Sequence, residues 1–239
     1  MKSERQSKVA AHVFYQQFKW SLWFFSILFV IHLARIFFLN SGVEAVDGFF
    51  IFAYQPVNVF MLVCGIMIVY VFMGQHIHQG ISRKEWYKGT ALSAIGLALI
   101  ITLVTLLING IQYVLQQFVS LPVALDNAIA FGTFEGALAS IAGFYFNALT
   151  FYMIGWMIGI GYYRFGWVIG FGFVALALVG FSLNDFFWEG NAYSTLLASW
   201  VPQFTPNTSF VVAITGSILL IAALFVFMVS MTKRVTIKM

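Results

Sequence analysis

The sequence predicts an all-α polytopic membrane protein, and three observations lead to that class. The 239 residues are 62% hydrophobic and only 8% charged. The charges form short clusters separated by long uncharged runs, such as Gly48–Ser82 and Gly190–Thr232. A helix needs about 20 apolar residues to cross the hydrocarbon core of a bilayer, and these runs reach that length. Helices also satisfy every backbone amide in lipid, and the period-2 alternation of a membrane barrel is absent from the sequence.

We expect six membrane-spanning helices in a single domain, 1–239. Each predicted span consists mainly of Leu, Ile, Val, Phe, Ala and Gly. The spans run from about 20–39, 50–73, 91–115, 138–161, 166–184 and 210–231. The connections between them are too short for a separate soluble domain. The single cysteine, Cys64, excludes a disulfide framework within the chain.

The positive charges support this number of spans and orient the chain. With six spans, eleven of the twelve Lys and Arg residues fall on one side of the membrane. They are Lys2, Arg5, Lys8, Lys19, Arg83, Lys84, Lys88, Arg164, Lys233, Arg234 and Lys238. Only Arg35 lies on the other side, with the acids Glu44, Asp47, Asp126, Glu135, Asp185 and Glu189. Bases in short flanking loops stay in the cytoplasm, so we expect both termini there. The net charge of +4 follows from these anchors and does not indicate a nucleic-acid partner.

The N-terminal segment 4–19 is predicted to be an amphipathic helix. Val9, Val13 and Trp20 recur near helical spacing, while Lys8 and Gln17 are among the residues on the polar side. Such a helix would lie in the cytoplasmic interface and turn into the first span at about Trp20. The alternative is a frayed, positively charged tail.

The loop 74–90 between the second and third spans contains a helix-start signal. Ser82 is followed three residues later by Glu85, which is the capping-box pattern, and Gly80 precedes it as a flexible residue. We expect the resulting short helix to present Trp86 and Tyr87, together with neighbouring bases, to the cytoplasm. Two interpretations fit: a surface for a partner protein, or an ordinary interfacial belt of aromatic and basic residues.

The connection 185–209 on the outer side is long and rich in aromatic residues, and Pro202 and Pro206 interrupt it. We expect it to form an amphipathic or re-entrant segment at the outer interface.

Taken together, this layout resembles the type-2 ABC exporter permeases, the membrane subunits of bacterial ABC transporters. The resemblance covers nearly the whole chain in layout: an amphipathic N-terminal helix, six spans, and apolar outer pieces before the last span. In residues it is concentrated in Gly-Ile-Ser-Arg-Lys-Glu-Trp-Tyr-Lys-Gly at 80–89, directly after the second span.

The resemblance implies roles for particular segments. In that family the segment after the second span is a coupling helix that rests in a groove of the ATPase subunit. Here it corresponds to Ile81, Ser82, Arg83, Lys84, Glu85, Trp86, Tyr87 and Lys88. Segment 4–19 would be the elbow helix, and the chain would lie in a bacterial plasma membrane.

The resemblance also implies partners. The sequence has no phosphate-binding Gly-x-x-x-x-Gly-Lys-Ser/Thr motif, so ATP and Mg²⁺ would be bound by a separate ABC ATPase subunit. A second permease subunit, identical or homologous, would be needed to enclose a path through the membrane lipid. The apolar interior suits a hydrophobic or amphipathic substrate, such as a peptide or a lipid-like molecule.

Glycine residues predict close helix packing in the second half of the chain. Gly155, Gly159, Gly166 and Gly170 form two four-residue pairs. Small residues let helix backbones approach in lipid. We expect them to bring the fourth and fifth spans together within one subunit.

The polar residues within the spans give candidates for the path but not for catalysis. Gln55, Asn58 and Asn147 are the possible path-lining residues, because polar groups at membrane depth usually face the bundle interior. No span holds paired carboxylates or another catalytic set, so we do not expect an enzyme or a cofactor site. His76 and His78 diverge on a helix, so a metal site is not expected.

A rival hypothesis is a non-transporting membrane immunity or sensor protein that binds a peptide at its outer loop. An ion-driven transporter is disfavoured, because charged residues that would line a proton or ion pathway and matched Pro-broken half-helices are missing.

Overall fold

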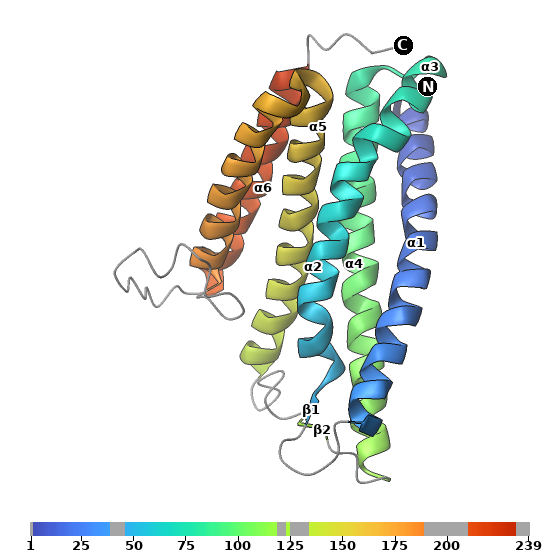
Figure 1. Ribbon diagram of the computed structural model, residues 1–239, viewed down its shortest axis with the longest axis vertical. Helices are drawn as coiled ribbons and strands as arrows, with labels where there is room; N and C mark the ends of the chain where they lie inside the picture. The colour runs from blue at the N-terminus through green and yellow to red at the C-terminus, as the bar shows by residue number, and fades with distance from the viewer. Residues whose placement is uncertain (1, 39–45, 119–122, 125–133, 189–209, 233–239) are drawn as a thin grey trace.

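The computed structural model describes residues 2–38, 46–118, 123–124, 134–188 and 210–232, which form a bundle of long helices (Figure 1). The helical elements are α1 (Lys2–Phe38), α2 (Phe49–Met67), the π-helix η1 (Ile68–Met73), α3 (Gly74–His78), α4 (Arg83–Gln116), α5 (Phe134–Phe187) and α6 (Phe210–Thr232). Five helical segments are long and apolar enough to cross a membrane, with α2, η1 and α3 forming one of them. These are the features of a multi-pass membrane protein, as the sequence predicts.

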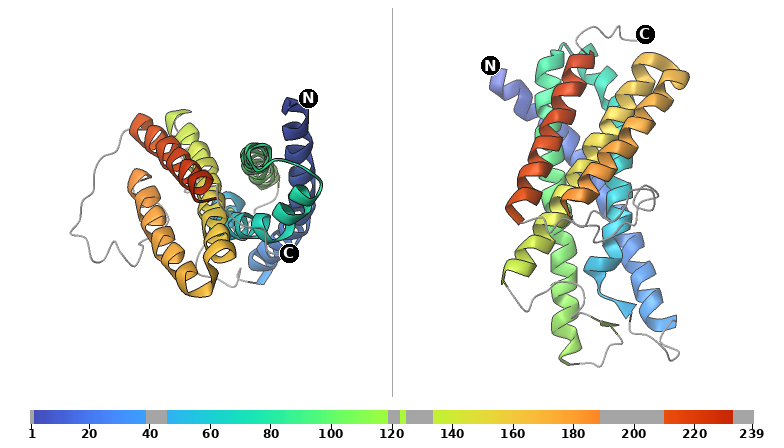
Figure 2. Two further views of the ribbon diagram at one scale, coloured as in Figure 1. Left: turned by 90° about the horizontal axis from the view of Figure 1, so that it is seen from above. Right: turned by 90° about the vertical axis from the view of Figure 1, so that its left-hand side faces the viewer.

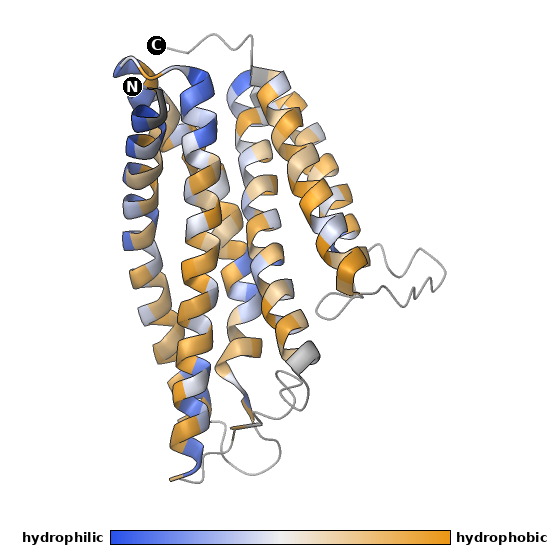
Figure 3. Cartoon of the chain, turned by 180° about the vertical axis from the view of Figure 1, so that it is seen from behind, coloured by the Kyte–Doolittle hydropathy of each residue, from blue (hydrophilic) through white to orange (hydrophobic). Residues whose placement is uncertain are grey.

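The helices pack in two groups joined by α2. Seen from above, α1 and α4 lie on one side and α5 and α6 on the other, with α2 between them (Figure 2). The main helix contacts are between α2 and α5, α1 and α4, and α5 and α6. Apolar residues cover most of the helix length, and hydrophilic residues gather where α1 and α4 begin and again in the last turns of α4 (Figure 3). A two-residue parallel pair, β1 (Val46–Asp47) and β2 (Val123–Ala124), closes the opposite end and was not predicted.

α5 is a helical hairpin rather than one straight helix. Its backbone breaks at Gly166, where φ is 79° and ψ is −174°. The residues before and after the break lie side by side and antiparallel (Figure 1). The rings of Phe151 and Phe181 are 4.5 Å apart, and the amide of Asn184 donates to the amide oxygen of Asn147. Positions equally distant from Gly166 therefore face each other.

The conformation of Gly166 is one that residues with a Cβ atom almost never adopt, and it costs them about 1–3 kcal/mol. We expect Gly166→Ala to lower the stability of the detergent-solubilised protein by about 2 kcal/mol, although a Cβ atom there would meet no other atom within 4 Å. Gly172→Ala is the matched control, because Gly172 has the same open surroundings but no positive φ. Equal melting temperatures for the two variants would contradict the expected strain.

α1 differs from the prediction for the N-terminal segment. It continues through Trp20 as one helix of 37 residues, so the expected turn between an elbow helix and the first span is absent. At 1.5 Å per residue this helix is about 55 Å long. Val9 and Val13, expected to face the interface, are buried in the bundle core, and Gln17, expected on the polar side, is buried as well. The stripe that they form packs against other helices rather than against lipid.

α1 and α4 run in parallel with a constant offset. A Cβ atom on Gly89 would lie 2.8 Å from the side chain of Val9, and one on Gly96 would lie 3.5 Å from the ring of Phe14. Further along, Gln112 of α4 reaches His32 of α1. Each of these pairs is separated by 80–82 residues in the chain.

The prediction that the glycine pairs bring the fourth and fifth spans together is only partly correct. Gly170 faces the ring of Tyr162 across the α5 hairpin, as expected for the fourth and fifth spans. Gly155 and Gly159 instead face the backbones of Leu62 and Ile66 in α2. The closest backbone approach therefore joins α5 to α2, two helices that run in the same direction.

The predicted outer segment 185–209 is described only as far as Trp188. Residues 189–209, which include both prolines and half of its aromatic residues, lie outside the described part of the chain. The same holds for Glu44, Asp126 and the three bases after Thr232.

Candidate functional site: the α3–α4 turn

The turn between α3 and α4 begins with a fixed helix end. The N–H groups of Gly80 and Ile81 donate to the carbonyls of Ile77 and His76 at 3.0 and 3.1 Å. This is a Schellman arrangement, which needs a left-handed residue, and Gly80 supplies it with φ of 77°. Gly80, expected to be flexible, is therefore the defined end of α3.

The turn ends with an equally defined helix start. The Ser82 hydroxyl accepts a hydrogen bond from the N–H of Glu85 at 3.3 Å, and the Glu85 carboxylate accepts one from the N–H of Ser82 at 3.1 Å. The predicted capping box is thus confirmed. The segment 81–88 is not a separate short helix, because α4 continues from Arg83 to Gln116.

The residues of the turn divide into exposed polar groups and buried aromatic groups. The exposed ones are His78, Gln79, Gly80, Ser82, Lys84 and Lys88. Ile81 and Arg83 are half-buried, and Glu85 is buried. Trp86 is 0% exposed and Tyr87 is 4% exposed. The expectation that these two aromatic residues face the cytoplasm is therefore wrong: their apolar rings are covered by other helices of the same chain.

Trp86 and Tyr87 pack against the fourth predicted span. The ring of Trp156 in α5 makes an edge contact with Trp86 at a centroid distance of 5.7 Å and a stacked contact with Tyr87 at 5.5 Å. One helical turn later, Gly89 lies against Val9 of α1. The start of α4 is thus held on two sides, and a displacement of the turn would be carried directly into α5 and α1.

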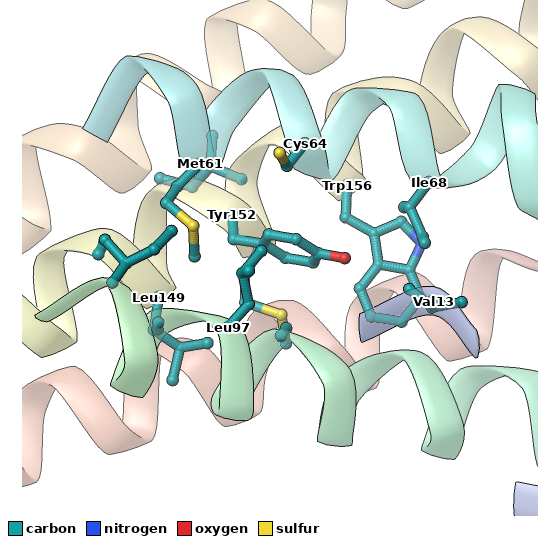
Figure 4. Close-up of a cluster of buried hydrophobic side chains, with 14 of the residues drawn as sticks. Val13, Met61, Cys64, Ile68, Leu97, Leu149, Tyr152 and Trp156 are labelled. Carbon is teal, nitrogen blue, oxygen red and sulfur yellow. The ribbon is translucent and has the colours of Figure 1, made fainter. Parts of the chain in front are cut away.

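Deeper in the bundle, one polar side chain connects three helices. The amide nitrogen of Gln17 donates to the carbonyl of Cys64 in α2 at 3.2 Å. The Tyr152 hydroxyl of α5 donates to the amide oxygen of Gln17 at 3.2 Å. These residues lie within a cluster of buried apolar side chains that includes Met61 and Leu97 (Figure 4). The network fixes the rotation of α1 against α2 and α5.

The two histidines of α3, His76 and His78, do not act together. Nδ1 of His76 lies 2.7 Å from the carbonyl of Phe72, so this nitrogen carries the proton. Nε2 of His76 then accepts from Nδ1 of His12 in α1 at 3.2 Å. His78 is exposed. Within the described residues there is no group of three or more His, Cys, Asp or Glu residues able to hold a metal ion.

The three path-lining candidates are not brought together. Gln55 lies on the exposed face of α2. Asn58 is buried, and its amide nitrogen has no hydrogen-bond partner in the described ranges. Asn147 is buried too, but its amide nitrogen donates to the carbonyl of Gly143 at 2.8 Å and its amide oxygen accepts from Asn184. Asn147 thus joins the two arms of the α5 hairpin. Of the three candidates, only Asn58 has a buried polar group that the described residues leave unpaired.

A second polar network, near the start of α2, was not predicted. Gly48 precedes α2 and offers no side-chain cap. Two α4 side chains replace it: the amide oxygen of Gln112 accepts from the N–H of Phe49 at 2.9 Å, and that of Asn109 accepts from Phe50 at 3.2 Å. The amide nitrogen of Gln112 also lies 2.7 Å from Nε2 of His32. The sequence signal for this network was Gly48, because glycine has no side chain that could cap the start of α2.

Comparison with protein-family models, with curated proteins and with solved structures finds no match for this chain.

Proposed function

We propose that the chain is the membrane subunit of an ATP-driven exporter of the type-2 ABC class. It crosses a bacterial plasma membrane six times, with both termini in the cytoplasm. Two features of the helix arrangement support this topology. The hairpin at Gly166 turns the longest of the five candidate segments into two crossings. α1 begins and α6 ends at the same end of the bundle, as an even number of crossings requires (Figure 1).

The orientation follows from the bases at that end. Arg5 and Lys8 lie at the start of α1, Lys84 and Lys88 at the start of α4, and Arg164 beside the bend of α5. The positive-inside rule assigns this end to the cytoplasm.

The α3–α4 turn carries the proposal, because it combines an exposed basic surface with a buried aromatic attachment to α5. A separate ATPase subunit binds the turn through Lys84 and Lys88, which pair with acidic residues on the ATPase surface. Trp86 and Tyr87 act on the other side: they transmit the movement of the turn to Trp156 and do not fill pockets on the ATPase. The ATPase binds ATP and Mg²⁺, and this chain contributes no catalytic residue.

In this proposal two permease subunits, identical or homologous, enclose the path. The transported molecule is hydrophobic or amphipathic, such as a peptide or a lipid-like compound. Support comes from the described interior, where a large cluster of apolar side chains surrounds a smaller number of buried amide, hydroxyl and imidazole groups, and where Glu85 is the one acid that the described residues bury.

The charge of the turn provides the test. We expect the double variant Lys84→Glu, Lys88→Glu to lower the amount of ATPase that co-purifies with the chain by about ten-fold, which corresponds to ~1.4 kcal/mol. The ATPase to test is an ABC ATPase without a membrane domain, sought among the genes beside that of this chain. Reversed charges repel acidic residues on the ATPase. Neither lysine is buried, and nine of the eleven bases predicted on the cytoplasmic side remain, so membrane insertion should be unchanged.

Arg5→Glu is the matched control, since Arg5 is exposed at the same end of the bundle but lies on α1. The proposal fails if no neighbouring ATPase co-purifies with the unmodified chain. It also fails if both charge reversals reduce recovery equally.

A further inference from the structure

One buried face of α4 carries three polar side chains that have no hydrogen-bond partner within the described residues. They are Nε1 of Trp86 and the hydroxyls of Thr90 and Ser93. All three residues are at most 2% exposed. Their spacing of four and then three residues places them on the same side of the helix, one turn after another. They form a continuous polar stripe in the inner part of the bundle, which we call the α4 stripe.

The hydroxyls of the α4 stripe differ from those further along the helix. Thr102 and Thr105 donate to the carbonyls four residues before them, at 2.8 and 2.9 Å. This local bond is available to any Ser or Thr in a helix. Thr90 and Ser93 do not use it. Their hydroxyls can therefore bond to a partner outside their own helix.

The α4 stripe faces α5. Trp86, at its cytoplasmic end, contacts Trp156, whose own Nε1 is also buried without a partner in the described chain. One turn beyond its other end, Leu97 belongs to the same buried cluster as Tyr152 and Leu149 of α5 (Figure 4). Thr90 and Ser93 lie between these two contacts, in the seam where α4 passes α5.

The chemistry of the seam defines its occupant. An indole N–H only donates a hydrogen bond, whereas a hydroxyl donates and accepts. The occupant must therefore present oxygen acceptors. The nearest acid, Glu85, is engaged by Ser82, and the nearest base, Lys88, is exposed, so no charge on the stripe selects an ion. A neutral oxygen fits these groups.

A buried polar group left unpaired costs about 1–3 kcal/mol, and native proteins pair such groups with protein atoms or ordered water. Three in consecutive turns of one seam indicate a common partner. We propose that the α4–α5 seam is a hydrated site, in which water enters from the cytoplasmic end and binds Trp86, Thr90 and Ser93. The site deepens the proposed function, because it makes this seam the inner part of the transport path. Its role in transport rests on the proposed function, whereas the presence of water in the seam does not.

The first test compares two substitutions of the same shape. Thr→Val replaces a hydroxyl by a methyl group, which is neutral or stabilising where the hydroxyl has no partner and destabilising where it has one. We expect Thr90→Val to lower the melting temperature of the purified protein by about 3 °C relative to Thr105→Val. Thr105 is equally buried, and its hydroxyl bonds only to the carbonyl of Ile101 in its own helix. That carbonyl keeps its helical N–H partner when the hydroxyl is removed, so Thr105→Val should lose little stability.

The second test measures access to the seam. In a Cys64→Ala background, Ser93→Cys should react with a small charged, membrane-impermeant thiosulfonate at least about ten-fold faster than Ala94→Cys, in open membranes from cells that express the chain. Ser93 and Ala94 are both buried, but Ala94 is not on the α4 stripe. A Thr90→Val variant as stable as Thr105→Val, or equal labelling of the two cysteines, would each overturn the hydrated site. Neither experiment involves the ATPase, so their failure is distinct from failure of the proposed function.

Discussion

Gly155→Ala is expected to disrupt the packing of α2 against α5. A Cβ atom at this position would lie 2.1 Å from the carbonyl oxygen of Leu62 and 2.9 Å from its carbonyl carbon. Both are backbone atoms, so no side chain can rotate away and the two helices must separate. Inserting one carbon into a packed core costs about 1–3 kcal/mol, and we expect the upper end of that range here. In detergent the melting temperature should fall by about 6–10 °C, and the amount of folded protein should fall with it.

Gly110→Ala provides the comparison. Gly110 lies in helix α4, and a Cβ atom there would meet no other atom within 4 Å, so this substitution should be neutral or slightly stabilising. Gly65→Ala should behave like Gly155→Ala, because its Cβ atom would lie 2.1 Å from the carbonyl oxygen of Tyr152. A Gly155→Ala variant that melts with the wild type would show that α2 and α5 are further apart than described.

Trp86→Ala is expected to have a comparable effect for a different reason. Trp86 is fully buried against Trp156 and Tyr87, so its removal leaves a cavity at the start of α4. Loss of a buried tryptophan costs about 3–5 kcal/mol in soluble proteins, and we expect about 3 kcal/mol here, because burial of apolar surface gains less between membrane helices. The measurement is thermal unfolding of the purified membrane subunit without its ATPase.

The absence of the ATPase makes this result informative. If Trp86 packs only within the chain, Trp86→Ala loses stability in isolation, whereas Lys88→Ala does not. Trp86→Phe should restore part of the stability by refilling the cavity. If the purified Trp86→Ala subunit were as stable as the wild type but no longer co-purified with the ATPase, Trp86 would have to lie on the surface of the turn. That result would contradict its burial.

The sequence predicted features that depend on neighbouring residues. The capping box is an example, since Ser82 and Glu85 satisfy each other's backbone within one turn, whatever the rest of the chain does. The helical class also follows from run length and composition alone. The break at Gly166 was visible only as a gap between two predicted spans beside Arg164, but the structure gives its cause in the positive φ of glycine.

Features that depend on which helices meet were not predictable. Gln17 looked like a residue of a polar helix face, and it is buried because Cys64 and Tyr152, far away in the sequence, supply its partners. Trp86 looked exposed because bases flank it, and it is buried because Trp156 covers it. Asn147 looked like a path-lining residue and is instead paired with Asn184. Periodicity shows which face of a helix is apolar but not what lies against it.

The constant offset between α1 and α4 has a consequence for how the protein is made. α1 leaves the ribosome before α4, yet its residues Val9, Phe14 and His32 contact residues of α4 that are 80–82 positions later in the chain. Contacts of such long range form late, because the intervening chain must be ordered first. Until residue 112 has been synthesised, His32 lacks the amide of Gln112, and Gln17 waits still longer for Tyr152. α1 therefore enters the membrane with polar groups that are still unpaired: His32 obtains its partner when α4 is made, and Gln17 obtains the hydroxyl of Tyr152 only when α5 is made.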